Sequence, residues 1–135
     1  MDLVNSLHIA ASGMKAQSDR LRIVSENIAN ADSLGTRPGE EPYRRKVVSF
    51  RNHLDREMGV SKVEVYKYGV DKSEFEKKYD PGHPAADNEG YVQLPNVNPV
   101  MEMVDMREAQ RGYEANLNVI EVSKGMLQRT VDMLR

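Results

Sequence analysis

The 135-residue sequence contains no cysteine, which excludes disulfide bonds, thiolate metal sites and cysteine nucleophiles together. Its formal net charge of -2 provides no general electrostatic field that would attract nucleic acid or anionic lipid. No apolar run reaches the length that crosses a membrane. No lysine or arginine precedes the mildly apolar start, so we expect no cleaved secretory signal. Length and composition leave a single domain as the default.

Two heptad patterns, one near each end of the chain, are the strongest positive signal. In each, mostly apolar residues recur at alternating steps of three and four. The first consists of Leu3, Leu7, Ala10, Met14, Gln17, Leu21, Val24, Ile28 and Ala31. The second consists of Met103, Met106, Gln110, Tyr113, Leu117, Ile120, Lys124, Leu127, Val131 and Leu134. A strict heptad keeps one narrow strip facing a partner along a whole helix, so the sequence predicts two long helices with coiled-coil seams.

Turn and capping residues mark the inner ends of both helices. Asn30–Gly39 collects helix-ending and turn residues, so the first helix should end near 30–33. Asn98 is the expected N-cap of the last helix, with Pro99 at its first position. Between these points, β-branched and aromatic residues predict strands at Tyr43–Phe50, Val60–Val70 and Tyr91–Leu94.

These elements predict an α+β fold in which the long N- and C-terminal helices pair as a coiled-coil-like hairpin around a small β-rich insert. The expected divisions are an N-terminal assembly helix and turn, the insert with its loops, and a C-terminal assembly helix. Their ranges are 1–34, 35–96 and 97–135. So small an insert buries too little surface to be firmly stable alone. One narrow strip cannot cover a helix about 40 Å long inside one compact domain, so we expect neighbouring subunits to complete the structure.

Several segments resemble those of the bacterial flagellar basal-body rod protein family, and the resemblance covers essentially the whole chain. Its N-terminal and closing helices carry the similarity most clearly, and the segment 33–41 follows the family only loosely. The matching segments are Ala11–Met14, Ser25–Asp32, Pro42–Lys46, Asp80–Pro84, Gly90–Val92, Pro95–Asn98, Glu102–Met106 and Arg111–Asn116.

The resemblance implies a structural axial component of the flagellar basal body, without catalysis or a cofactor. Such a subunit polymerises with copies of itself and other rod proteins into the proximal rod, which transmits motor torque and encloses the export channel. It also implies contact with basal-body adaptor and ring components. Export through the flagellar type III apparatus without a cleaved signal would bring the subunit to the periplasm. Terminal segments of related axial proteins are disordered before assembly, which fits seams that one chain cannot bury.

The residues expected to make subunit contacts come from both seams and from the motifs that carry the resemblance. They are Leu3, Leu7, Ala10, Met14, Leu21, Val24, Asn27, Ile28, Asn30, Met103, Met106, Arg111, Tyr113, Asn116, Leu117, Ile120, Leu127, Val131 and Leu134. The plainer interpretation of the apolar ones is an ordinary core in a self-contained helical bundle.

Other patterns favour structural roles over chemistry. The basic run Tyr43–Lys46 is typical of nucleic-acid contacts, but three charges on one strand favour a solvated strand or one that makes salt bridges between subunits. Asp80, His83 and Asp87 could bind a metal, yet the prolines and glycine among them indicate turns. No recognisable acid–base or nucleophile pattern surrounds the isolated histidines, so we expect no enzyme. The alternative function is a cytoplasmic coiled-coil adaptor that forms a discrete oligomer.

Overall fold

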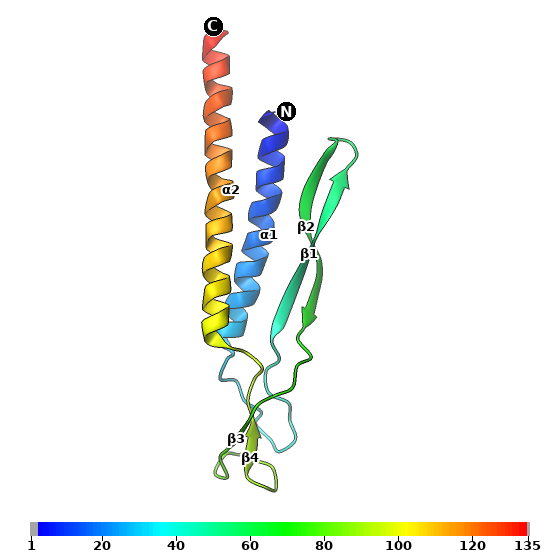
Figure 1. The fold of residues 1–135 in the computed structure, drawn as a ribbon, viewed down its shortest axis with the longest axis vertical. Helices are drawn as coiled ribbons and strands as arrows, with labels where there is room; N and C mark the ends of the chain where they lie inside the picture. The colour runs from blue at the N-terminus through cyan, green and yellow to red at the C-terminus, as the bar shows by residue number, and fades with distance from the viewer. Residues whose placement is uncertain (1–2, 135) are drawn as a thin grey trace. The chain divides into compact units, whose positions relative to one another are not determined.

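The computed structural model describes residues 3–134 (Figure 1). Its elements, in chain order, are α1 (Leu3–Ala29), β1 (Lys46–Asp55), β2 (Val60–Val70), β3 (Lys77–Tyr79), β4 (Tyr91–Gln93) and α2 (Pro99–Met133). The chain divides into two compact units. Unit 1 contains the residues up to 21, 48–67 and those from 107 onward, and unit 2 contains 22–47 and 68–106.

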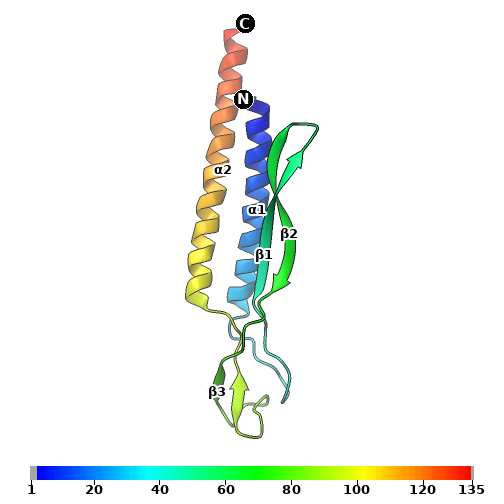
Figure 2. The same cartoon turned by 45° about the vertical axis from the view of Figure 1, so that its right-hand side comes forward.

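Unit 1 consists of two antiparallel helical segments and most of a β-hairpin. The α1 and α2 segments lie side by side, and the β1–β2 hairpin lies beside α1 (Figure 2). The backbone N–H of Val63 donates to Ser12 Oγ at 3.3 Å, which joins β2 to α1. The fully buried apolar residues of this unit are small, namely Ala10, Ala16 and Ala109. Small side chains let the elements approach closely but bury little apolar surface.

Unit 2 holds loops, a second small sheet and the inner ends of both helices. Strands β3 and β4 pair antiparallel, with Lys78 opposite the buried Val92 and Tyr79 opposite Tyr91. The two tyrosine rings pack edge to face, with centroids 5.3 Å apart. Gly90 precedes β4 with a φ of 83°, a conformation that glycine adopts without steric cost.

The helix ends agree with the capping residues in the sequence. Asn98 Oδ1 accepts hydrogen bonds from the backbone N–H groups of Val100 and Met101, and Pro99 is the first residue of α2. At the other boundary, Asn30 Nδ2 donates to the carbonyl oxygen of Glu26 at 2.8 Å, next to the end of α1. Both boundaries were predicted, because capping depends on local sequence.

The strand predictions were partly wrong. Strand β2 has the predicted bounds, but β1 begins at Lys46 rather than Tyr43 and runs on to Asp55. The N–H of Tyr43 donates to the carbonyl of Ser33, and the N–H of Arg45 donates to Asn96 Oδ1. Backbone groups before Lys46 are therefore used by loops instead of a strand ladder. Strand β3 was missed, because its three residues carry no recognisable alternation.

The predicted fold class is wrong in its coiled-coil-like hairpin. The structure has two long helices with small antiparallel sheets between them in the chain, and residues 3–134 show no coiled coil. Two contacts between the helices in unit 1 set an amide against a glycine: Gly13 faces Asn116, and Gln17 faces Gly112. Seam residue Leu117 keeps 38% of its surface exposed. The heptad pattern identified apolar rows but not the neighbour that covers each row.

Candidate assembly site

Asn27, from the Asn-containing end of α1, is the centre of a buried polar cluster in unit 2. It is 1% exposed and uses all of its side-chain hydrogen-bonding capacity. Its Nδ2 donates to the carbonyl of Lys46 at 2.9 Å and to Glu102 Oε2 at 3.1 Å. Its Oδ1 accepts from the Tyr43 hydroxyl and the N–H of Lys46, both at 2.9 Å. One side chain therefore joins α1, the start of β1 and the first turn of α2.

Glu102 brings a carboxylate into this cluster at the first turn of α2. It is 1% exposed, and its Oε1 accepts from Arg45 Nε at 2.5 Å. A buried carboxylate is costly unless it is paired and hydrogen-bonded, and Arg45 with Asn27 meets both conditions. The position near a helix N-terminus also favours negative charge. We call Asn27, Tyr43, Arg45 and Glu102 the polar junction.

The basic residues of the Tyr43–Lys46 run are occupied within unit 2. Arg44 Nη1 donates to the carbonyls of Asp71 and Ser73, and its guanidinium lies 4.2 Å from the Phe75 ring centroid. Lys46 Nζ donates to Glu26 Oε2 at 2.8 Å, which lowers the pKa of that carboxyl. These contacts lie within the chain, whereas the sequence predicted a solvated strand or salt bridges between subunits.

Asp71 and Asn96 extend the polar contacts around Arg45. Asn96 Nδ2 donates to the carbonyl of Asp71 and to Ser73 Oγ, both at 3.0 Å. The pKa of Asp71 is lowered by the N–H and hydroxyl of Ser73, and then by the charges of Arg45 and Arg44. These bonds fix the loop that follows β2 against the segment that leads into α2.

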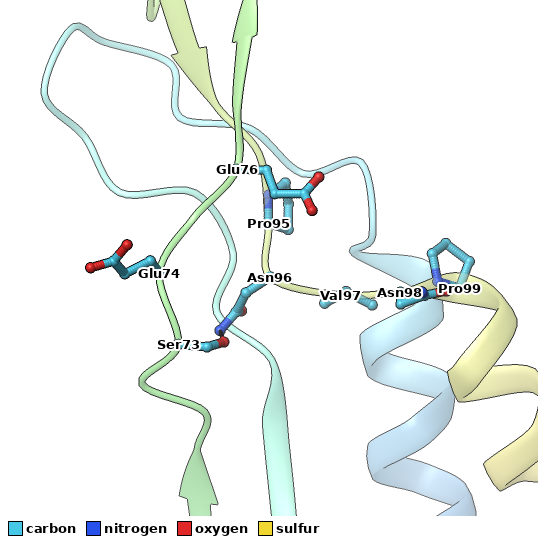
Figure 3. Close-up of a pocket in the computed structure, with 8 residues that line it drawn as sticks. All are labelled: Ser73, Glu74, Glu76, Pro95, Asn96, Val97, Asn98 and Pro99. Atoms are coloured by element: carbon cyan, nitrogen blue, oxygen red, sulfur yellow. Dashed lines mark hydrogen bonds between the residues drawn. The ribbon is translucent and has the colours of Figure 1, made fainter.

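Unit 2 has a small hollow of about 110 Å³ next to β4 and two larger, open ones. One, of about 450 Å³, is bounded by the segments 73–76 and 95–99 (Figure 3). Glu74 and Glu76 line it, and Asn96 lies near Ser73 at its edge. The other, of about 510 Å³, is lined by Arg22, Ile23, Glu26, Lys46, Tyr68, Gly69 and Val70. Neither presents a nucleophile beside a base, so their geometry offers no recognisable chemistry.

The residues expected to contact other subunits fall into three groups. Ala10, Val24 and Asn27 are buried within the chain. The half-buried ones are Leu3, Leu7, Met14, Leu21, Ile28, Asn30, Met106, Tyr113, Asn116, Ile120 and Leu127. The exposed ones are Met103, Arg111, Leu117, Val131 and Leu134. Residues of the last two groups retain surface that another subunit can cover.

An exposed apolar row on α2 was missed from the sequence. Val119, Val122, Met126 and Met133 are 46%, 57%, 50% and 79% exposed. Their steps of three, four and seven place them on one face of the helix. We call these four residues the α2 ridge. The spacing of the ridge is visible in the sequence. The heptad seam through Leu117 and Ile120 lies on the same helix, and the predicted subunit contacts were assigned to that seam instead.

No metal or membrane feature appears within residues 3–134. None of the helices there is long and apolar enough to cross a bilayer. No group of three or more His, Asp or Glu side chains in this part of the chain is placed to hold a metal ion. His83 Nδ1 accepts a hydrogen bond from the N–H of Ala85 at 3.1 Å, which is a turn contact.

Comparison with protein families matches both ends of the chain. A model described as flagella basal body rod protein matches residues 7–37. A model of the C-terminal region of flagellar basal body rod FlgEFG proteins matches residues 88–133. The first match contains Asn27 and the second contains Glu102 and the α2 ridge. The class indicated is that of flagellar rod proteins.

Individual relatives identify the family more narrowly. Flagellar basal-body rod protein FlgC of Agrobacterium fabrum is 56% identical over 94% of this chain and 91% of the relative. FlgC of Salmonella typhimurium is 42% identical over 98% of each chain. FlgC of Bacillus subtilis is 40% identical over 98% of this chain and 99% of the relative. The chain therefore belongs to the FlgC family of flagellar basal-body rod proteins.

Proposed function

We propose that this structural rod component assembles through the exposed surface of its helices, and above all through the α2 ridge. The observation that carries the proposal is this row of four apolar side chains, each about half exposed or more. Burying a large apolar side chain contributes roughly 1.5 to 3 kcal/mol. A rod subunit has neighbours along its length, so the ridge becomes a contact surface when the rod forms.

Partners follow from membership of the rod family. We propose that other rod proteins and copies of this chain are the direct neighbours, in the proximal rod, where the assembly transmits torque and encloses the export channel. Adaptor and ring components of the basal body are further proposed partners. Delivery by the flagellar type III export apparatus, without a cleaved signal, would bring the subunit to the periplasm. This function requires no catalysis and no cofactor.

We further propose that the terminal segments 1–34 and 97–135 supply the subunit contacts. Their half-buried and exposed apolar residues, including Leu7, Met14, Ile120 and Leu127, add to the α2 ridge. Ordering a residue costs about 1 to 2 kcal/mol of backbone entropy, so burial between subunits must offset the ordering of any segment that is loose in the free chain. The polar junction acts inside the chain and holds the base of both helices.

Charge placed on the ridge tests the proposal. Val122→Asp puts a carboxylate where a neighbouring subunit is expected, at a residue that is 57% exposed. Gln128→Asp places the same carboxylate at an exposed position on another face of α2, six residues from Val122, and serves as the matched control. Each variant replaces the native protein in a flagellated bacterium, and swimming and recovery in purified basal bodies are measured.

The expected result is loss of swimming and of basal-body recovery for Val122→Asp, with normal behaviour for Gln128→Asp. Both purified variants should melt at the parent temperature, since neither site is buried. Normal assembly of Val122→Asp would contradict the role of the ridge. The alternative of a cytoplasmic coiled-coil adaptor predicts instead a discrete soluble oligomer that is absent from basal bodies.

A further inference from the structure

The two helices of unit 1 approach each other closely at two glycines. A Cβ atom at Gly13 of α1 would lie 2.8 Å from Nδ2 and 2.9 Å from Oδ1 of Asn116 on α2. A Cβ atom at Gly112 of α2 would lie 3.1 Å from Cδ and Nε2 of Gln17 on α1. Each glycine therefore leaves a notch, and an amide side chain of the opposite helix fills it.

The arrangement is reciprocal. Each helix carries a glycine followed four residues later by an amide side chain: Gly13 and Gln17 on α1, Gly112 and Asn116 on α2. Residues four apart lie on one face of a helix. Because the segments run antiparallel, each glycine meets the amide of the other helix. The two helices share a further feature: an alanine precedes each amide residue, Ala16 on α1 and Ala115 on α2.

The amide groups are held in place. Asn116 Nδ2 donates to the carbonyl of Gly112 at 2.8 Å, so the side chain that fills one notch is bound to the backbone of the other. Gln17 Oε1 is buried without a hydrogen-bond partner within residues 3–134. A buried amide oxygen without a partner costs free energy. Gln17 therefore contributes by filling the notch at Gly112 and not through a hydrogen bond of that oxygen.

We propose that these four residues form a register clasp that selects one antiparallel alignment of α1 and α2. Moving α2 by one turn in one direction would place Gln17 against Asn116, so that two amides meet without a notch. Moving it one turn in the other direction would place Gly13 against Gly112 and leave a void. The apolar rows of α2 do not discriminate in this way, because a heptad repeats with every second turn.

The clasp goes beyond the proposed function, since it concerns how the chain chooses its own helix partner. Helices with several apolar rows can pair in more than one way, and specificity then requires features that penalise the alternatives. A clasp of small and polar residues supplies such a penalty. It also leaves the large apolar side chains of the α2 ridge available for other contacts.

Thermal unfolding gives the first test. Gly125 is the matched control, because a Cβ atom at this α2 position meets nothing within 4 Å. Alanine favours helix over glycine, so Gly125→Ala should raise Tm by about 4 °C. Gly13→Ala should leave Tm unchanged or lower it, since its Cβ atom displaces the Asn116 amide from its hydrogen bond to the Gly112 carbonyl. In an Asn116→Ala background the notch is empty, and Gly13→Ala should become stabilising there.

Cysteine cross-linking gives the second test, which works even where a variant unfolds at a low temperature. The chain has no cysteine of its own. Arg20 Nη2 and Glu108 Oε2 lie 3.4 Å apart, so Arg20→Cys with Glu108→Cys, treated with a bifunctional maleimide about as long as the two side chains that they replace, reports the observed register. Arg20→Cys with Arg111→Cys reports a shift of about one turn.

The first cysteine pair should cross-link efficiently in the parent chain and at least fivefold more slowly after Gly13→Ala. Adding Asn116→Ala to Gly13→Ala should restore the cross-linking rate of this pair. Two results would overturn the proposal: stabilisation by Gly13→Ala equal to that by Gly125→Ala, or cross-linking of both cysteine pairs at the same rate in the parent chain. Equal cross-linking rates would also be observed if the two helices did not pair in the free chain, and that outcome counts against the proposal as well.

Discussion

Asn27 on α1 donates a hydrogen bond of 3.1 Å to the carboxylate of Glu102 on α2, and both side chains are 1% exposed. The residues are 75 positions apart in the sequence. The bond brings the end of the first helix to the beginning of the last. Since Asn27 also binds both backbone polar groups of Lys46, it fixes where β1 starts. An amide suits this position because it donates and accepts at once.

Removing the carboxylate of the polar junction should destabilise the chain strongly. Glu102→Ala leaves Arg45 without its buried partner and removes one of the two acceptors of Asn27 Nδ2. Breaking a buried charge pair typically costs about 3 to 5 kcal/mol, and we expect a loss of about 3 kcal/mol in the free energy of unfolding. Urea denaturation measures it. Glu108→Ala is the control, because Glu108 pairs with Arg20 but its side chain is 68% exposed.

The control variant should lose less than about 1 kcal/mol, as is usual for exposed ion pairs. Equal losses for the two variants would show that burial of Glu102 contributes nothing, and would remove the argument for the polar junction. Glu102→Gln adds a finer comparison. It keeps the size and one acceptor but not the charge, so its loss should fall between those of the two alanine variants.

Stability should decrease on acidification. The hydrogen bond from Lys46 lowers the pKa of Glu26, that from Lys62 lowers the pKa of Asp55, and the N–H of Ser73 lowers the pKa of Asp71. A carboxyl with a lowered folded-state pKa stabilises the chain above its unfolded pKa. That contribution is lost as the pH falls through the folded pKa. The unfolding free energy should therefore decline below pH 4.5, the ordinary pKa of glutamate.

Urea denaturation at a series of pH values measures this dependence. Glu26→Gln should make it shallower, because its carboxyl no longer titrates. Glu121→Gln, at an exposed position of α2, is the matched control and should leave the curve unchanged. A curve that is equally steep for Glu26→Gln and the parent would contradict the assigned role of the Lys46–Glu26 pair.

Local sequence predicted the boundaries of the fold better than its contacts. Asn98 and Pro99 correctly predicted the start of α2, and the predicted bounds of β2 match the structure. Both predictions depend on capping and β-propensity, which act over a few residues. Strand β1 was displaced by contacts with Ser33 and Asn96, which lie far from it in sequence. Rules based on local sequence do not take account of contacts with such residues, so they could not predict where β1 begins.

The helix pairing could not be predicted from periodicity for a related reason. Apolar spacing identified Leu7, Met14 and Leu21 as one row, but not whether a helix, a hairpin or another subunit covers it. Side chains that join the helices in unit 1 include amides set against glycines and the Arg20–Glu108 ion pair, which a search for apolar residues does not find. Among the predicted assembly residues, Asn27 illustrates the same limit, since its partners lie inside the chain.

A side chain at Gly90 should destabilise the chain for two reasons, the backbone conformation and the contact with Tyr79. Its φ is 83°, and a Cβ atom would lie 2.9 Å from the Tyr79 ring. Gly39 has a similar φ of 81° but nothing within 4 Å of its Cβ position. Gly39→Ala should therefore cost only the backbone strain, about 1 to 2 kcal/mol. Gly90→Ala should cost clearly more in urea denaturation, and equal costs would mean that Tyr79 moves aside freely.

Amide exchange should distinguish the paired part of α2 from its last turns. Residues 109–123 include Ala109 and Ser123, which are 0% and 6% exposed, whereas Val131 and Met133 are 62% and 79% exposed. Amides of 128–133 should therefore exchange faster in the free chain, because few contacts oppose local opening. In purified basal bodies the same amides should become protected, since subunit contacts on the α2 ridge order these turns. Fast exchange of 128–133 in both states would leave Met133 outside any contact and would restrict the assembly surface to the residues before it.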